Sequence, residues 1–145
     1  MADWWQWSPQ KEEESLTFAV VGVGRFGTAV CRELISNGVD VLAADASEKA
    51  IDDLRQLEPS IEARVIDCTD EESMKESGIL EMNTVVVGIS EPIEASITTT
   101  LIAKDSEGTK VKRVIARATS DLHEKMLKRE ALIRLFSLLE CKVKD

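Results

Sequence analysis

The sequence contains few of the residues that several common protein classes require. Its 145 residues include one histidine, three cysteines and no tyrosine, and aromatic residues make up 4%. Cys31, Cys68 and Cys141 are widely spaced and form no C-x-x-C pair, so we expect no zinc site, no other metal site and no disulfide framework. No spacing connects the single histidine, His123, with a nucleophile, which argues against a catalytic role.

Positive charge and long apolar runs are also scarce. The 27 acidic and 18 basic side chains give a net charge of −9, which repels a phosphate backbone and predicts no nucleic-acid partner. The basic residues that concentrate between Lys110 and Arg134 are interpreted as a solvated face. The opening MADWWQWSPQKEEE is acidic where a secretory signal is basic, and no apolar run approaches the length of a membrane span. We therefore expect a cytoplasmic protein.

The length fits one domain with a buried core, because 43% of the residues are apolar and they are spread along the chain. Residues 1–15 form a polar lead-in, interrupted by Trp4, Trp5 and Trp7. These tryptophans either dock a partner or pack on their own domain or on a neighbouring subunit. Residues 16–131 are expected to form the domain, and residues 132–145 a helical extension.

Within the domain, short β-branched runs alternate with amphipathic segments. The runs are LTFAVVG, VDVLAAD, ARVID, TVVVGI and VKRVIARA, and they are apolar on both faces, as in buried parallel strands. Helices are predicted at about 25–37, 47–57, 69–78 and 92–105, and after Ser120. The third opens with Thr69 as the first residue of a capping box. This alternation predicts an α/β fold, a Rossmann-like doubly wound parallel sheet of strand order 3-2-1-4-5.

The motif GVGRFG lies between the first strand and the first helix. In the dinucleotide-binding turn, Gly22 makes the tight turn, Gly24 lets a phosphate approach the backbone, and Gly27 lets helix and strand pack closely. The helix N-terminus offers N–H groups to the phosphates. Phe26, which precedes Gly27 in the motif, is also included among the binding residues.

Asp45 ends the second predicted strand, 18 residues after Gly27. A carboxylate there accepts hydrogen bonds from ribose hydroxyls and repels a 2′-phosphate, so NADP is disfavoured and ATP, ADP, AMP or NAD remain. Arg25 adds a full charge to the loop, which favours a terminal phosphate and hence ATP or ADP, with NAD(H) as the other candidate. Arg117, at the end of the fifth strand, either reaches the far phosphate or forms a surface ion pair.

Two further strand ends are expected to line the site. Asp67, Cys68 and Thr69 lie beside the adenine end, where Asp67 can accept from the base, although Thr69 also caps the next helix. Gly88 and Ser90 leave room for ligand next to the glycine loop. No G-K-[ST] follows the glycines, so a Walker phosphate-transfer loop is excluded, and we assign no catalytic residue.

These separated motifs resemble a known family. The stretches VVGVGRFG, VLAAD, VVVGI followed by EASITTTLIAK, and RVIARATSDLHEKMLKRE are similar to the RCK domain, also called KTN or TrkA-N. Among its members the sequence looks most like the cytosolic regulatory subunit of Ktr/Trk-type bacterial potassium uptake systems. The similarity covers about residues 16–130.

The resemblance implies a nucleotide-sensing domain that forms dimers, and in the full system an octameric ring, at the inner face of the membrane. Nucleotide exchange would gate a membrane-embedded potassium channel or transporter subunit. It further implies that Arg25 contacts phosphate, Asp45 ribose, and Arg117 the terminal phosphate. The helix carrying EASITTTLIAK would contribute to the dimer surface. The sequence departs from the family after the fifth predicted helix, because REALIRLFSLLECKVKD (129–145) contains no glycine turn. We also expect the usual second regulatory domain to be absent. The alternative is a small NAD-dependent oxidoreductase, or a fragment of one, with His123 or Glu91 as its acid or base.

Overall fold

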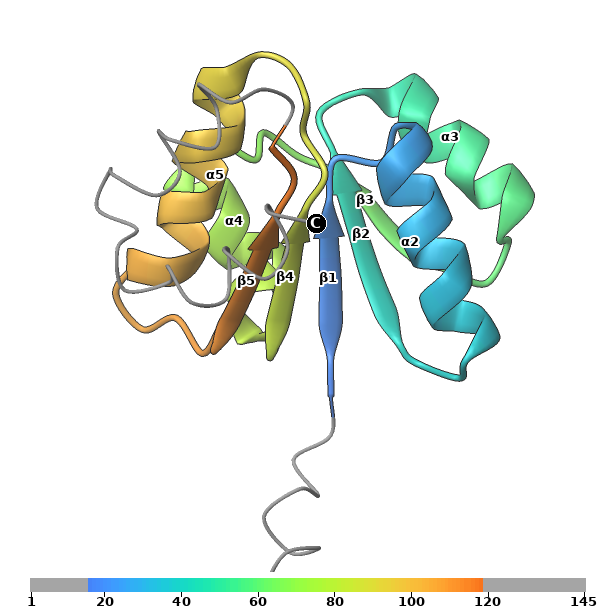
Figure 1. Cartoon of the computed structure of the whole chain (residues 1–145), viewed down its shortest axis with the longest axis horizontal. Coiled ribbons are helices and arrows are strands. Elements are labelled where there is room, and N and C mark those ends of the chain that lie inside the picture. The colour runs from blue at the N-terminus through green and yellow to red at the C-terminus, as the bar shows by residue number, and fades with distance from the viewer. Residues whose placement is uncertain (1–15, 119–145) are drawn as a thin grey trace, which may run out of the picture.

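The computed structural model describes residues 16–118. Its parallel sheet has five strands in the order β3-β2-β1-β4-β5, which confirms the predicted topology (Figure 1). The elements are β1 (Phe18–Val21), α2 (Arg25–Ser36), β2 (Val41–Asp45), α3 (Glu48–Leu57), β3 (Glu62–Val65), α4 (Glu71–Ser77), the 3₁₀ turn η1 (Ile79–Glu81), β4 (Thr84–Val87), α5 (Ile93–Asp105) and β5 (Arg113–Ala116).

Several expectations concern parts of the chain outside the described residues. These are the roles of the N-terminal tryptophans and of His123, the state of Cys141, the helix after Ser120 and the helical extension over residues 132–145. Of the helices between residues 16 and 118, none has the length and apolar character needed to cross a membrane.

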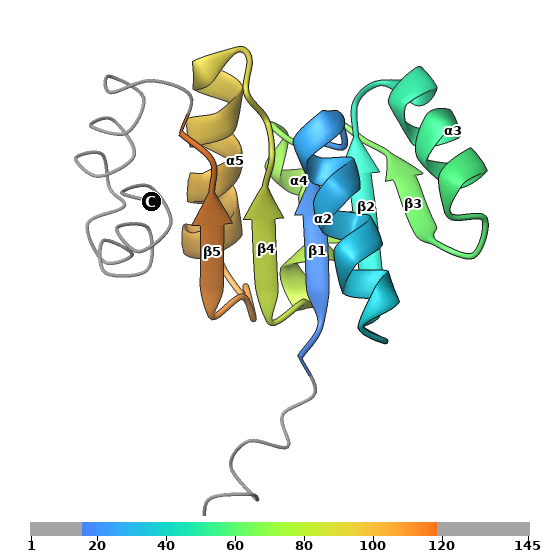
Figure 2. The same ribbon diagram turned by 45° about the vertical axis from the view of Figure 1, so that its right-hand side comes forward.

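The helices cover the sheet in two layers. Helices α2 and α3 pack on one face and α4 and α5 on the other (Figures 1 and 2). All five strands run in the same direction, so their carboxyl ends share one edge of the sheet. At this edge the connections after β1 and β4 diverge. The chain passes from β1 to α2 on one face of the sheet and from β4 to α5 on the other.

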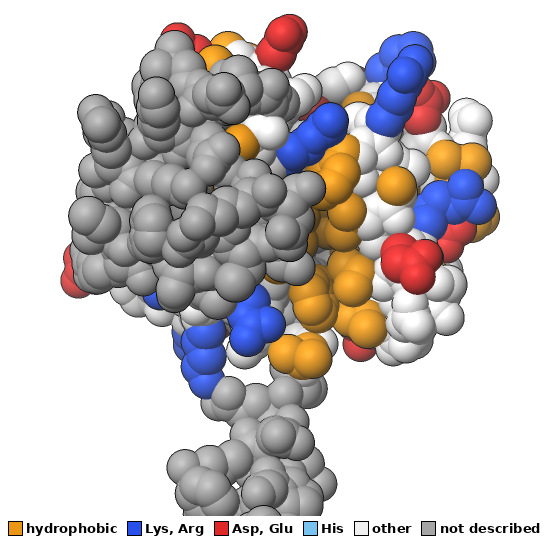
Figure 3. Space-filling model, in the orientation of Figure 1, with side chains coloured by type: hydrophobic (Ala, Val, Ile, Leu, Met, Phe, Trp, Pro, Cys, Tyr) orange, Lys and Arg blue, Asp and Glu red, His pale blue; other side chains and the backbone are white. Residues whose placement is uncertain are grey.

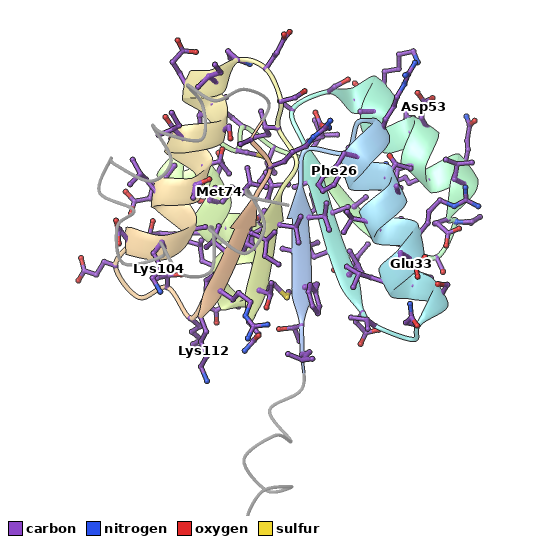
Figure 4. The ribbon with its side chains drawn as sticks, viewed as in Figure 1. Phe26, Glu33, Asp53, Met74, Lys104 and Lys112 are labelled. Atoms are coloured by element: carbon purple, nitrogen blue, oxygen red, sulfur yellow. The ribbon has the colours of Figure 1, made fainter. Side chains whose placement is uncertain are left out.

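Each face has its own core, because successive side chains of a strand point to opposite sides. On β1, Ala19 and Val21 belong to the cluster under α4 and α5, whereas Val20 belongs to the cluster under α2 and α3. Met74 of α4 is fully buried in the first cluster (Figure 4). Apolar surface remains visible beside α2 (Figure 3), and half-buried side chains border the second cluster at Phe18, Val30, Leu34, Ile35 and Ile115.

The third strand differs from the prediction. It was expected to be buried on both faces, but only Ala63 of β3 is buried, whereas Glu62, Arg64 and Val65 are exposed. The reason is that β3 lies at the edge of the sheet and pairs with β2 alone, and charged side chains on an edge strand discourage pairing with another chain.

The helix ends are largely those that the sequence predicts. Ser47 caps α3 by accepting a hydrogen bond from the Ala50 N–H, and Gly78 ends α4 in the left-handed conformation. The predicted capping box at Thr69 is wrong. Asp70 is the N-cap of α4, and its carboxylate accepts from the N–H and hydroxyl of Ser73.

The glycine turn brings α2 unusually close to the sheet. Gly22 has φ +90°, a conformation that L side chains rarely adopt. A Cβ at Gly27 would overlap the carbonyl oxygen of Gly22, whereas a Cβ at Gly24 would meet nothing within 4 Å. The first and third glycines are therefore required by the backbone itself, and the middle one is not.

We predict that Gly27→Ala lowers the free energy of unfolding by about 2 kcal/mol or more, because a backbone carbonyl cannot move away as a flexible side chain can. Gly24→Ala is the matched control and should change it by less than about 1 kcal/mol. Urea denaturation of both variants without ligand measures the difference. Equal stabilities would contradict the close packing of α2.

Candidate functional site

A cavity of about 310 Å³ opens at the carboxyl edge of the sheet. It lies where β1 and β4 are neighbours and their following helices go to opposite faces, which is where ligands bind in open α/β sheets. Its lining comes from four strand ends and the first turn of α5, namely Gly22, Gly24, Asp45, Ala46, Asp67, Cys68, Thr69, Gly88, Ile89, Ser90, Glu91, Pro92 and Ala95.

The glycine turn presents the N-terminus of α2 to this cavity. Gly24 is the N-cap of α2, so no side chain caps the helix, and its first turn contains no acidic residue. The positive end of the helix is thus left to interact with an anion. The turn itself is held by two backbone bonds, from the Gly22 N–H to the Ala44 carbonyl at 2.8 Å and from the Gly88 N–H to the Val21 carbonyl at 2.7 Å.

Asp45 connects the second strand with the glycine turn. Its Oδ2 accepts from the Val23 N–H and its Oδ1 from the Ser47 N–H, each at 2.8 Å. A carboxylate has about four acceptor positions, so each oxygen retains capacity for a ribose hydroxyl. Asp45 therefore shapes the turn as well as lining the cavity, a structural role that the sequence analysis did not anticipate.

The loop after β3 forms another wall of the cavity. Asp67 Oδ1 accepts from the Thr69 N–H at 3.0 Å and from the Thr69 hydroxyl at 2.6 Å. The hydroxyl bond, followed by the N–H bond, lowers the pKa of Asp67. Thr69 thus binds Asp67 and does not cap α4, so Asp67 has one oxygen already engaged when it faces a ligand.

The connection from β4 to α5 supplies more of the wall than we predicted. Gly88 and Ser90 line the cavity as expected, but so do Ile89, Glu91, Pro92 and Ala95. Ala46, after β2, is a further residue that the sequence analysis did not include. The sequence contained a sign of this wall. Few residues separate the end of the fourth predicted strand from the predicted helix start at Pro92, so the segment between them has to stay at the carboxyl edge of the sheet.

Four predicted binding residues do not line the cavity. Gly27 lies under the turn, and Arg25 lines a separate surface hollow with Gly24, Arg32 and Asp53. Phe26 extends from the first turn of α2 over the top of the sheet (Figure 4). The Arg117 guanidinium lies 5.0 Å from the centre of the Phe26 ring, and its backbone N–H binds the Val87 carbonyl at 3.1 Å.

Among residues 16–118, the charged side chains that line the cavity are acidic: Asp45, Asp67 and Glu91 line it, and no lysine or arginine of this range does. Attraction for a phosphate therefore has to come from backbone N–H groups at the turn or from arginines at its rim. Among residues 16–118, no three or more His, Cys, Asp or Glu side chains are grouped so that they could hold a metal ion.

Cys68 is a buried thiol in the cavity wall, with 5% of its surface exposed. Burial, followed by the charges of Asp45 and Asp67, raises the pKa of its thiol to about 12. Cys31 lies in the core under α2 and α3, and burial raises the pKa of its thiol to about 12 as well. Both thiols are therefore expected to remain protonated in the folded protein well above pH 9.

We predict that Cys31 and Cys68 react with iodoacetamide at pH 9 at least about tenfold more slowly in the native protein than in urea, because the thiolate is the reactive species. Mass spectrometry of the peptides separates the two rates. The raised pKa values also imply a pH dependence of stability. The contribution of the two protonated thiols to the free energy of unfolding is fully present below pH 9, the ordinary thiol pKa, and is lost as the pH rises toward 12. A native rate for Cys68 that equals its unfolded rate would contradict this environment.

Comparison with known proteins agrees with this architecture. The TrkA-N domain family model matches residues 18–137. The chain is 39% identical over 110 residues to the Ktr system potassium uptake protein C of Bacillus subtilis, and this match covers 76% of this chain and 48% of that protein. It is 37% identical over 112 residues to the Ktr system potassium uptake protein A of Vibrio alginolyticus, covering 77% and 49% respectively.

A solved structure is similar as well. The NAD(P)-binding domain of an exopolyphosphatase-related protein from Archaeoglobus fulgidus has a TM-score of 0.65 and 26% identity, and the match covers 83% of this chain and 82% of that one. The chain spans about half the length of the two potassium uptake proteins. Both of these relatives are named as potassium uptake proteins and not as enzymes. By its sequence motifs, its strand order and the family match over residues 18–137, the chain belongs to the TrkA-N domain family.

Proposed function

We propose that the chain is the nucleotide-sensing domain of a regulatory subunit that gates a membrane potassium transporter or channel. The observation that carries this proposal is the cavity at the β1–β4 switch, bounded by the uncapped N-terminus of α2 and by Asp45. The relation to two potassium uptake proteins supports the choice of system.

The cavity suggests how an adenine nucleotide would lie. Phosphates would approach Gly22 and Gly24, where the helix N-terminus offsets their charge. Ribose hydroxyls would donate to the remaining acceptor positions of Asp45, and the base would lie toward Asp67, Cys68 and Thr69. This orientation keeps the phosphates away from the carboxylate of Asp67, which would repel them, because β3 and β1 lie on opposite sides of β2.

The terminal phosphate would then extend past Gly24 toward Arg25. Gly24 lines both the cavity and the hollow that contains Arg25, so a chain of phosphates can pass from one to the other over a residue without a side chain. Arg117 is the second arginine at the rim, and we propose that a terminal phosphate competes with the Phe26 ring for its guanidinium.

These positions favour ATP or ADP and keep NAD(H) as the other ligand class. The similar domain from Archaeoglobus fulgidus is described as NAD(P)-binding, so its relation to this chain is compatible with a dinucleotide. NADP is disfavoured because its 2′-phosphate would meet the Asp45 carboxylate, and none of the described side chains that line the cavity carries a compensating positive charge.

Gating requires that the nucleotides bind two subunit arrangements with different affinity. We propose a homodimer, assembled into an octameric ring in the full system, that lies at the cytoplasmic face of the membrane under its channel or transporter subunit. A coupling of about 1–3 kcal/mol is typical of such allostery. The alternative, a small NAD-dependent oxidoreductase, is supported by Glu91 in the cavity wall, but the two relatives are potassium uptake proteins.

We expect calorimetry to give tighter binding of ATP and ADP than of NADH, and NADPH binding at least about tenfold weaker than NADH because of repulsion by Asp45. Measurement of the mass in solution, with and without nucleotide, tests self-association. Hydride transfer from NADH to a carbonyl substrate that is lost in Glu91→Gln would favour the oxidoreductase. Tight NADPH binding or a persistent monomer would contradict the proposal.

We predict that Arg25→Ala weakens ATP at least about tenfold and AMP by less than about threefold, because a guanidinium interacts most strongly with a terminal phosphate. Arg32→Ala is the matched control, since Arg32 lines the same hollow but its Nε is 3.8 Å from Glu58. That variant should bind both nucleotides as the native protein does. Equal losses of ATP and AMP in Arg25→Ala would exclude a contact with the terminal phosphate.

A further inference from the structure

Helix α5 buries an unusual number of hydroxyl groups. Ser96, Thr99 and Thr100 are each 0% exposed, on a helix whose other buried residues are Ile97 and Ala103. A buried hydroxyl is unfavourable unless it forms a hydrogen bond, and valine has nearly the same shape as threonine without this requirement. The hydroxyls at positions 99 and 100 are therefore informative through the bonds they make.

The two threonines make bonds of different kinds. Thr100 Oγ1 donates to the Ser96 carbonyl at 2.7 Å, a bond within α5 that any helix can form. Thr99 Oγ1 leaves the helix and donates to the Cys68 carbonyl at 3.0 Å, 31 residues earlier in the sequence. Thr99 thus joins α5 to the loop after β3, which forms the wall of the cavity.

This loop has its own internal bonds, and Thr99 adds a connection to the body of the fold. Within the loop, Asp67 accepts from Thr69, and the Asp70 N–H binds the Asp67 carbonyl at 3.1 Å. At its start, the Ile66 N–H binds the Asp45 carbonyl at 3.1 Å. Thr99 holds the middle of the loop at Cys68, and Asp67, Cys68 and Thr69 all line the cavity.

We propose that Thr99 is a positioning residue for the base-binding wall of the cavity. It acts through the Cys68 carbonyl and determines where Asp67 and Thr69 lie relative to an adenine ring. This role rests on the proposed nucleotide function, and it assigns to α5 a direct mechanical connection with the base end of the ligand. A valine at position 99 would fill nearly the same space but could not form the hydrogen bond with the Cys68 carbonyl, so the loop would lose its connection to α5 through Thr99.

The test compares Thr99→Val with Thr100→Val in the full chain, because both changes remove one hydroxyl from a fully buried threonine of α5. Calorimetry measures ATP and GTP, and thermal melting without ligand measures stability. We expect Thr99→Val to weaken ATP about tenfold and GTP by less than about twofold, because the loosened wall contacts the base. Thr100→Val should leave the affinity for ATP and the ratio of ATP to GTP affinities unchanged.

If Thr99→Val fails to fold, the variants Thr99→Ser and Thr99→Ala provide a second test of the same hydroxyl group. Thr99→Ser retains the hydroxyl and should preserve the ratio of ATP to GTP affinities, whereas Thr99→Ala should lower it. An unchanged ratio in Thr99→Val or Thr99→Ala, or an equal loss in Thr100→Val, would overturn the role of Thr99. If the native protein binds none of ATP, ADP or NADH, the proposed function itself fails, which is a different outcome from native binding without an effect of Thr99.

Discussion

The site depends on the packing around one backbone atom, the carbonyl oxygen of Gly22. A Cβ at Gly27 would overlap this oxygen, and a Cβ at Gly88 would lie 2.8 Å from it. The start of α2 and the end of β4 therefore meet the turn after β1 with no side chain between them. Because of this contact the N-terminus of α2 lies at the carboxyl edge of the sheet, and beyond the ends of β1 and β4 the cavity is bordered by the backbone of Gly22, Gly24 and Gly88.

Asp45 completes this arrangement from the second strand. Its bonds to the Val23 and Ser47 N–H groups fix the turn and the start of α3 at the same time. Thr99 has a comparable effect on the loop after β3. The walls of the cavity are therefore held by single polar side chains that connect neighbouring segments, while the apolar clusters on the two faces of the sheet hold the strands.

The sequence predicted the fold well because its signals are local. The β-branched runs, Ser47, Gly78 and the three glycines each specify a strand, a cap or a turn without reference to distant residues. The cap of α4 and the exposure of β3 were predicted wrongly, because neither is determined by local sequence alone. Whether Thr69 or Asp70 caps the helix depends on the competing bond with Asp67, and the exposure of β3 depends on its place at the edge of the sheet.

The candidate site was predicted in part for the same reason. Residues at strand ends, such as Asp45, Cys68 and Ser90, were found because parallel strands end at one edge. The positions of Arg25 and Arg117 depend on side-chain directions that spacing does not give. Ala95 was missed because it enters the cavity from a helix, where only the packing of α5 determines which residue of the first turn faces inward.

The contact between Arg117 and Phe26 has a consequence for selectivity. A guanidinium over an aromatic face is stabilised by about 0.5–1 kcal/mol at an exposed site. Under the proposed nucleotide function, an anion that draws Arg117 away from the ring would have to offset this loss, which corresponds to a factor of about two to five in affinity. Di- and triphosphate groups would offset it more easily than a singly charged group, because a guanidinium binds them with stronger charge-assisted hydrogen bonds, so the contact with Phe26 would bias Arg117 modestly toward the more highly charged ligands.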